Sequence, residues 1–181
     1  MKSNLKSFKA LQGDAIELND FNINNISVDY ISWLNDPIVL QYSNQRFITH
    51  DFISCKKYLK TFAGTDNLFL SIKTKKTNIY IGTLSVYLNI NHGVADVGIM
   101  IGNKREWGKG YGQDAWNTIL SFLLKKQDVR KITAGTLDCN TAMRNIIEKS
   151  GMKIEGVRNE QELINGKPQD VVLYAILNKE N

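Results

Sequence analysis

The sequence of 181 residues has only two cysteines and two prolines, and it lacks a long apolar run. Cys55 and Cys139 are too few for a disulfide framework or a zinc site, so we expect a reduced setting and no metal. No stretch approaches the roughly 18 consecutive apolar residues of a membrane span, and residues 1–4 lack the apolar core of a signal peptide. These absences predict a cytoplasmic protein with no membrane partner.

The sequence also lacks a dense cluster of charges of one sign. The formal net charge is +5, and the densest group of lysines is Lys73, Lys75 and Lys76. No basic stripe with interleaved aromatic residues is present, so we expect no nucleic-acid partner. The positive balance keeps the protein in solution and would also raise the capture rate of a polyanionic ligand. At this length we expect one domain spanning residues 1–181.

Glycine is concentrated in one place, the segment Trp107-Gly108-Lys109-Gly110-Tyr111-Gly112, which we call the glycine loop. Glycine leaves the backbone bare and permits positive φ. Residues 95–101 before the loop are predicted to form a buried strand, and residues 113–126 after it a helix. One face of that helix carries Trp116, Ile119, Leu120 and Leu123. Because free N–H groups at a helix N-terminus bind anions, the loop is a candidate phosphate site.

Other phosphate motifs match the glycine loop less well. A Walker loop requires Ser or Thr after the lysine, but Gly110 follows Lys109. The dinucleotide fingerprint matches at Gly110, Gly112 and Ala115, yet too little chain follows for a doubly wound domain. A plain flexible turn between strand and helix is the remaining alternative, although such a turn rarely needs three glycines and a lysine.

Residues 96–156 resemble the GNAT superfamily of acyl-CoA-dependent N-acetyltransferases. That family's phosphate loop reads Gln/Arg-x-x-Gly-x-Gly/Ala, and Trp107 stands here in the Gln/Arg place, as in the branch that includes the ribosomal-protein N-terminal acetyltransferases. Asn140 and the segment Glu148-Lys149-Ser150-Gly151-Met152 also match. The resemblance implies an α+β fold, with a central twisted, mostly antiparallel sheet and helices on both faces.

The resemblance also implies the contacts of acetyl-CoA, the expected co-substrate. The strand that ends at Ile101 is expected to splay from the strand that ends near Asp138, and the thioester would lie between them; Gly98 would permit a bulge there. The expected cofactor-binding residues are Ile99, Met100, Ile101, Trp107, Gly108, Lys109, Gly110, Tyr111, Gly112, Asn140 and Asn145. In the glycine loop, backbone N–H groups are expected to matter more than the Lys109 side chain.

Acetyl transfer to an amine needs a general base, because an alkyl ammonium titrates near ~10.4. Asp96 is the first candidate, since it lies on the strand before the glycine loop and shares a face with Gly98 and Met100. Asp138 is the second candidate, although it would equally cap the next helix. Many relatives carry a tyrosine acid where this chain has Ile147, which leaves water as the expected proton donor to the thiolate.

Three regions are expected along the chain: an acceptor-side half (1–78), an acetyl-CoA-binding core (79–156) and a C-terminal hairpin (157–181) that turns at Asn165-Gly166. Arg46 is a candidate for binding an acidic group on the acceptor, or simply a surface arginine. Glu162 is a candidate for binding a cationic acceptor, or an ordinary surface charge. The expected strands are 15–18, 68–74, 79–90, 94–101, 131–138, 152–163 and 169–177. The expected helices are 29–34 with a continuation at 38–42, a helix from Thr49 to Phe62, 113–126, and a short helix opened by Asn140.

Together these features predict an acetyl-CoA-dependent N-acetyltransferase that works by direct transfer in a ternary complex. The acceptor is a primary amine, belonging to a protein N-terminus, a polyamine or an amino sugar. The alternative is a catalytically weak acyl-CoA-binding sensor or scaffold. A homodimer is compatible with such a fold.

Overall fold

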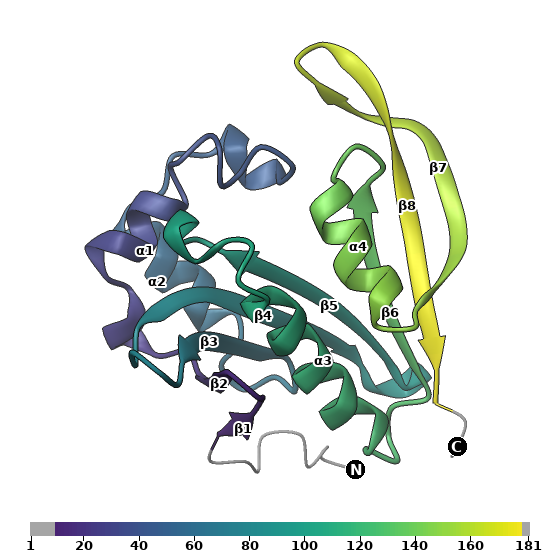
Figure 1. Ribbon diagram of the computed structural model, residues 1–181, viewed down its shortest axis with the longest axis horizontal. Helices are drawn as coiled ribbons and strands as arrows, with labels where there is room; N and C mark the ends of the chain where they lie inside the picture. The colour runs from purple at the N-terminus through teal and green to yellow at the C-terminus, as the bar shows by residue number, and fades with distance from the viewer. Residues whose placement is uncertain (1–9, 179–181) are drawn as a thin grey trace.

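The structure is a computed structural model, and it describes residues 10–178. An eight-stranded sheet runs through the molecule in the order β1-β2-β3-β4-β5-β6-β8-β7 (Figure 1). Among the described strands, β5 and β6 pair in parallel and the other neighbours are antiparallel. The strands are β1 (Leu11–Gln12), β2 (Ile16–Asp20), β3 (Leu68–Thr74), β4 (Tyr80–Asn89), β5 (Val94–Ile101), β6 (Lys131–Leu137), β7 (Lys153–Ile164) and β8 (Lys167–Leu177). Residues 1–4, where the sequence predicts no signal peptide, lie outside the described residues.

Within residues 10–178, four α-helices and four short 3₁₀ helices accompany the sheet. The α-helices are α1 (Val28–Trp33), α2 (Phe52–Lys60), α3 (Tyr111–Leu124) and α4 (Thr141–Lys149); the 3₁₀ helices are η1 (Ile23–Asn25), η2 (Asn44–Phe47), η3 (Ile90–His92) and η4 (Lys104–Glu106). The predicted α+β fold, with a mostly antiparallel sheet covered by helices, is confirmed. No helix within residues 10–178 is long and apolar enough to cross a membrane.

Two hydrophobic cores lie on opposite faces of the sheet. The first packs α3 against the sheet, and the predicted helical face is buried there: Trp116, Ile119, Leu120 and Leu123. The second lies under α1 and α2 and is rich in aromatic rings, with Phe21, Tyr30 and Phe69 among its members. Val97 belongs to the first core and Met100 packs against the second. The alternation along β5 therefore places Asp96 on the face of α1 and α2.

The start of α2 differs from the prediction. Asp51, and not Thr49, caps the helix: its carboxylate accepts the N–H of Ser54 at 2.7 Å. Ser54 returns the contact, because its hydroxyl oxygen accepts the N–H of Asp51 at 2.9 Å. This reciprocal pair is a capping box with serine in place of glutamate, which a search for glutamate overlooks.

The first turn of α2 leaves its apolar residues largely exposed. Phe52 and Ile53 are 45% and 75% exposed, whereas Cys55 is buried. The cap of α2 lies two residues later than predicted, at Asp51 in place of Thr49, and this shift changes which residues of the helix face the second core. Residues 38–42 also differ, since they form turns rather than helix. Asp36 holds these turns by accepting the N–H of Ile38 at 2.8 Å.

The feature that opens a site is the divergence of β5 and β6. The two strands pair only at Val94–Ala95–Asp96 with Lys131–Ile132–Thr133, and beyond this point β5 follows β4 while β6 follows β8 (Figure 1). The register between β4 and β5 is unbroken, so the bulge permitted at Gly98 is not present. The predicted splay is nevertheless there, because the parallel ladder ends after Asp96.

Asp114 ties α3 to the first strands of the sheet, a role that sequence reasoning missed. Its carboxylate accepts the backbone N–H groups of Asp14, Ala15 and Ile16 at 3.0, 2.7 and 3.0 Å.

We expect Asp114→Ala to lower the free energy of unfolding by roughly 2–4 kcal/mol, because three donors lose a charged acceptor. Urea denaturation measures this, with the exposed Asp20→Ala as control; equal midpoints for the two variants would contradict the role.

Candidate active site

The glycine loop has the geometry of an anion site at the start of α3. Gly108 and Gly110 have φ of 74° and 84°, and a Cβ added to either would meet no atom within 4 Å. Gly110 is the N-cap, so no side chain caps α3, whereas Ser27, Asp51 and Asn140 cap α1, α2 and α4. The first bond of the helix is donated by Asp114 to the carbonyl of Gly110 at 3.0 Å. The N–H groups of residues 111–113 come before Asp114 in the helix and therefore have no acceptor within it, so they can donate to a ligand.

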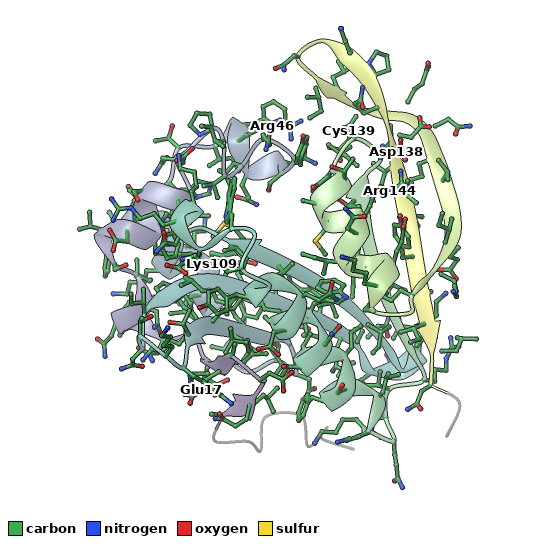
Figure 2. The ribbon with its side chains drawn as sticks, in the orientation of Figure 1. Glu17, Arg46, Lys109, Asp138, Cys139 and Arg144 are labelled. Atoms are coloured by element: carbon green, nitrogen blue, oxygen red, sulfur yellow. The ribbon has the colours of Figure 1, made fainter. Side chains whose placement is uncertain are left out.

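The side chains of the glycine loop have other partners. Trp107 donates its indole N–H to the carbonyl of Ile101 at 2.7 Å, which ties the loop back to the end of β5. Lys109 forms a 2.9 Å ion pair with Glu106 (Figure 2 shows the place of Lys109). A Cβ on Gly112 would lie 3.3 Å from Ile146 of α4, so this glycine permits close helix packing. Of the predicted loop residues, Gly108 and Gly110 thus offer the openly accessible backbone.

The backbone of β5 offers hydrogen-bonding groups toward β6 at alternate residues. The N–H of Gly102 donates to Ile81 on the β4 side at 2.9 Å. In an antiparallel ladder both polar groups of a residue point to the same side, and the side alternates along the strand. Ile99 and Ile101 therefore turn their N–H and C=O groups toward the divergence, whereas Met100 turns them toward β4. Of the three predicted backbone partners for the cofactor, Met100 is thus the least suited.

Asn140 and Asn145 lie on the other side of the divergence, at α4. The Asn140 oxygen accepts the N–H of Met143 at 3.2 Å and caps α4, while its amide donates to Thr136 at 3.1 Å. Asn140 is therefore the N-cap of α4. Asn145 is exposed on α4. The contacts of both residues with a cofactor stay predictions.

Asp138 is held by a cation that sequence reasoning did not single out. The Arg144 guanidinium contacts the Asp138 carboxylate at 2.6 Å, the Tyr174 hydroxyl at 3.2 Å and Glu148 at 3.3 Å (Figure 2). Asp138 does not cap α4, since Asn140 does. The Asp138 carboxylate is thus engaged in an ion pair with Arg144. The i, i+4 spacing of Arg144 and Glu148 on one helix was the only available sequence signal.

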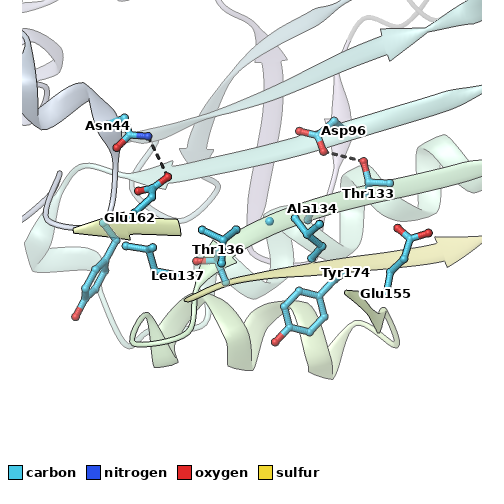
Figure 3. Close-up of a pocket in the computed structure, with 13 residues that line it drawn as sticks. Asn44, Asp96, Thr133, Ala134, Thr136, Leu137, Glu155, Glu162 and Tyr174 are labelled. Carbon is cyan, nitrogen blue, oxygen red and sulfur yellow. Dashed lines mark hydrogen bonds between the residues drawn. The ribbon is translucent and has the colours of Figure 1, made fainter. Parts of the chain in front are cut away.

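Asp96 lies in a cavity of about 480 Å³, which we call the carboxylate pocket (Figure 3). The hydroxyl of Thr133 donates to its carboxylate at 2.7 Å, across the last rung of the β5–β6 ladder. Burial among protein atoms raises the pKa of Asp96 above its ordinary value, and the Thr133 hydrogen bond offsets part of that rise. The carboxylate still reaches solvent through the open pocket. The assignment of Asp96 as general base stays a prediction.

The carboxylate pocket carries acidic side chains, although the whole chain is basic. Asp96, Glu155 and Glu162 line it, and none of its lining residues is a lysine or an arginine. The full lining is Tyr42, Asn44, Asp96, Thr133, Ala134, Gly135, Thr136, Leu137, Glu155, Glu162, Val171, Leu173 and Tyr174. The structure thus brings the two candidates Asp96 and Glu162 into one cavity, from strands far apart in the sequence.

Arg46, by contrast, does not line the carboxylate pocket. Its guanidinium donates to the carbonyls of Ser43 and Leu163 at 2.8 and 3.1 Å, and it lies 4.3 Å from the centre of the Phe47 ring. These contacts join η2 to the tip of the C-terminal hairpin. Arg46 is therefore engaged in a structural link, and its predicted contact with an acidic acceptor group has no support in this arrangement.

A strand divergence beside an uncapped, glycine-rich helix start is the architecture of acyl-CoA-dependent acetyltransferases, and the comparisons with known proteins agree. Residues 24–153 match the family model described as the acetyltransferase (GNAT) domain. The chain therefore belongs to the GNAT acetyltransferase family, as the sequence motifs predicted. A curated relative, the probable N-acetyltransferase YjcK of Bacillus subtilis, is 25% identical over 127 residues, covering 69% of this chain and 70% of that protein.

Solved structures share the fold at low sequence identity. The RimL ribosomal L7/L12 α-N-protein acetyltransferase, in complex with coenzyme A, has a TM-score of 0.82 at 15% identity, covering 95% of this chain and 99% of that one. A spermidine N-acetyltransferase from Vibrio cholerae, in complex with CoA and spermine, has a TM-score of 0.79 at 21% identity, covering 91% and 96%. At these identities the likeness shows the fold, and the acceptor must be argued from the site.

Proposed function

We propose that this acetyltransferase moves the acetyl group of acetyl-CoA directly to the primary amine of a small cationic acceptor in the carboxylate pocket. The observation that carries the proposal is the position of Asp96, a carboxylate of raised pKa at the last rung before β5 and β6 diverge. Family membership supports the acyl transfer, and the acidic lining supports a positively charged acceptor over an anionic one. We also propose the cytoplasm as the place of action.

The glycine loop fits the diphosphate of acetyl-CoA. Gly108 and Gly110 leave open space where side chains would stand, and the uncapped start of α3 offers N–H donors to an anion. When bound, acetyl-CoA supplies the thioester acyl group. The N–H groups of Ile99 and Ile101 face the divergence and would donate to the acyl oxygen, where negative charge develops. The Trp107 contact engages only the carbonyl of Ile101, so both N–H groups stay candidate donors.

Asp96 removes the proton that the acceptor ammonium must lose before it attacks. A base is most effective when its pKa approaches the working pH, and burial moves the pKa of Asp96 in that direction. Asp138 is the weaker candidate because Arg144 pairs with it. Ile147 is buried in the first core, so the position of the family's tyrosine acid offers no proton. We propose that water protonates the leaving thiolate.

The decisive experiment measures thiol release from acetyl-CoA across a panel of amines. The panel contains aliphatic amines, a peptide with a free N-terminus and an amino sugar, with acetyl-CoA binding measured separately by calorimetry. We expect turnover with the cationic aliphatic amines. Tight binding of acetyl-CoA without turnover on any amine would favour the sensor or scaffold instead, and turnover confined to the peptide would overturn the small acceptor.

Thr133 is expected to set the pH dependence of the reaction. It donates to the Asp96 carboxylate, which favours the charged form and holds the pKa below the value that burial alone would give. Removing this donor in Thr133→Val raises the pKa further, so the acidic limb of the kcat/KM profile should move to higher pH. Thr133→Ser keeps a hydroxyl and should leave the limb near its original position. Identical profiles for wild type and Thr133→Val would contradict the link.

A further inference from the structure

The two ends of the carboxylate pocket each hold a carboxylate without a cationic partner. Of the three acidic side chains, Glu155 is neutralised by the ammonium of Lys131. Asp96 receives only the neutral hydroxyl of Thr133, and Glu162 only the neutral amide of Asn44 at 3.1 Å. Among residues 10–178, no ion pair of Asp96 or Glu162 is found. Two negative charges in one cavity therefore remain for a ligand to balance.

These two charges lie at opposite ends of the pocket (Figure 3). Asp96 contacts Thr133 near the start of β6, while Glu162 lies with Leu137 and Asn44 at the other end. The residues of β6 from Thr133 to Leu137 form the floor of the pocket. Thr133 and Leu137 are four residues apart, so at about 3.3 Å per residue this floor spans roughly 13 Å. Side chains that reach inward shorten the span between the charges.

The middle of the pocket has a different chemistry from its ends. Between the two carboxylates the lining includes Gly135, Val171 and Leu173, which carry no side-chain polar groups; the hydroxyl of Thr136, also in the lining, accepts from the Asn140 amide. Leu173 and Val171 pair with Gly135 and Leu137 across the β6–β8 ladder, so these residues form one continuous surface. An apolar stretch between two anionic ends is complementary to an aliphatic chain with a cation at each end.

The segment that contains η2 holds the Glu162 carboxylate in place. Asn44 of η2 donates to Glu162, and Arg46 of the same helix donates to the carbonyl of the adjacent Leu163 at 3.1 Å. These two contacts bridge segments that lie more than a hundred residues apart in the sequence. The Arg46 contact fixes the backbone, while the Asn44 contact orients the carboxylate without neutralising it.

We propose that the protein selects linear acceptors with two cationic centres, one at Asp96 and a second bound by Glu162 at the far end of the pocket. This inference rests on the proposed acetyl transfer. Glu162 is then a specificity-determining residue: it binds the end of the acceptor that does not react. The span of the floor favours ammonium groups on the order of 10–13 Å apart, which is longer than a short diamine reaches.

The test compares diamines with monoamines of matched length. Diaminobutane, diaminohexane and diaminooctane are assayed beside butylamine, hexylamine and octylamine, with wild type, Glu162→Gln and Glu160→Gln. Glutamine keeps the oxygen that accepts from Asn44 and removes only the charge. Glu160 lies on the same strand but is exposed and outside the pocket lining, so it is the matched control.

We expect kcat/KM to rise with diamine length and to exceed that of the matched monoamine. Glu162→Gln should raise the KM for diaminooctane about tenfold to hundredfold, as for a lost contact between charged groups, and change kcat and the octylamine reaction far less. Glu160→Gln should behave as wild type. If Glu162→Gln weakens diamines and monoamines alike, or if diamines have no advantage over monoamines, the inference is overturned.

Calorimetric binding of diaminooctane separates this inference from the proposed function. If no amine is acetylated, the proposed transfer fails. Binding of diaminooctane that is weakened in Glu162→Gln and retained in Glu160→Gln would still support the two-charge site. Equal binding to all three proteins would remove it, even if some amine is turned over.

Discussion

Asp96→Asn is expected to lower kcat by about 10²–10⁴-fold, the usual contribution of a positioned general base. Asparagine keeps the shape of the side chain and can still accept the hydroxyl of Thr133, which lies 2.7 Å away in the wild type. It cannot take a proton from the acceptor. The remaining activity should also lose the acidic limb of the pH profile that the raised pKa of Asp96 produces. Steady-state kinetics at several pH values measure both effects.

Two further measurements make this prediction specific. Thermal unfolding of Asp96→Asn should match wild type, because the substitution removes no core contact. Asp138→Asn provides the comparison with the second sequence candidate; its main expected effect is on the contact with Arg144, without removal of the acidic limb. If Asp138→Asn abolished that limb while Asp96→Asn kept it, the base would have been assigned to the wrong strand.

Gly110→Trp is expected to abolish measurable acetyl-CoA binding while the domain stays folded. Gly110 has φ of 84°, and no heavy atom lies within 4 Å of an added Cβ, so an indole there would project into the space above the start of α3. Each lost hydrogen bond to a charged group costs about 1.5–3 kcal/mol, so losing two weakens binding by roughly 100-fold or more. Calorimetry with coenzyme A reports the affinity, and circular dichroism reports the fold.

Gly64→Trp is the matched control for backbone strain. Gly64 has φ of 72° and equally open surroundings, yet it lies after α2, outside the glycine loop. Both variants place a bulky residue in the left-handed region and should lose similar stability, on the order of 1–3 kcal/mol. Only Gly110→Trp should lose coenzyme A. Retained affinity in Gly110→Trp would mean that the phosphates lie elsewhere.

Local sequence pattern was sufficient to predict structural features that depend on one short segment. The glycine loop, the buried face of α3 and the hairpin turn at Asn165-Gly166 follow from bare backbone, helical period and positive φ. The start of α2 was placed wrongly because its capping box uses Ser54, and a short polar residue at that position is a weak signal. The partners of Arg46 could not be read locally, because a long cationic side chain can reach many acceptors and one of its carbonyl acceptors lies on the distant hairpin.

The sequence by itself determined the family, the glycine loop before α3 and the face of β5 on which Asp96 lies, since each depends on residues close together in the chain. Only the tertiary structure decided that Asp96 and Glu162 share a pocket, that Arg144 forms an ion pair with Asp138 and that Lys131 forms one with Glu155. The physical reason is that these properties arise from pairs of side chains on different strands and helices. Their distances are set by how β6, β8 and β7 pair after the sheet diverges, and no local pattern encodes that pairing.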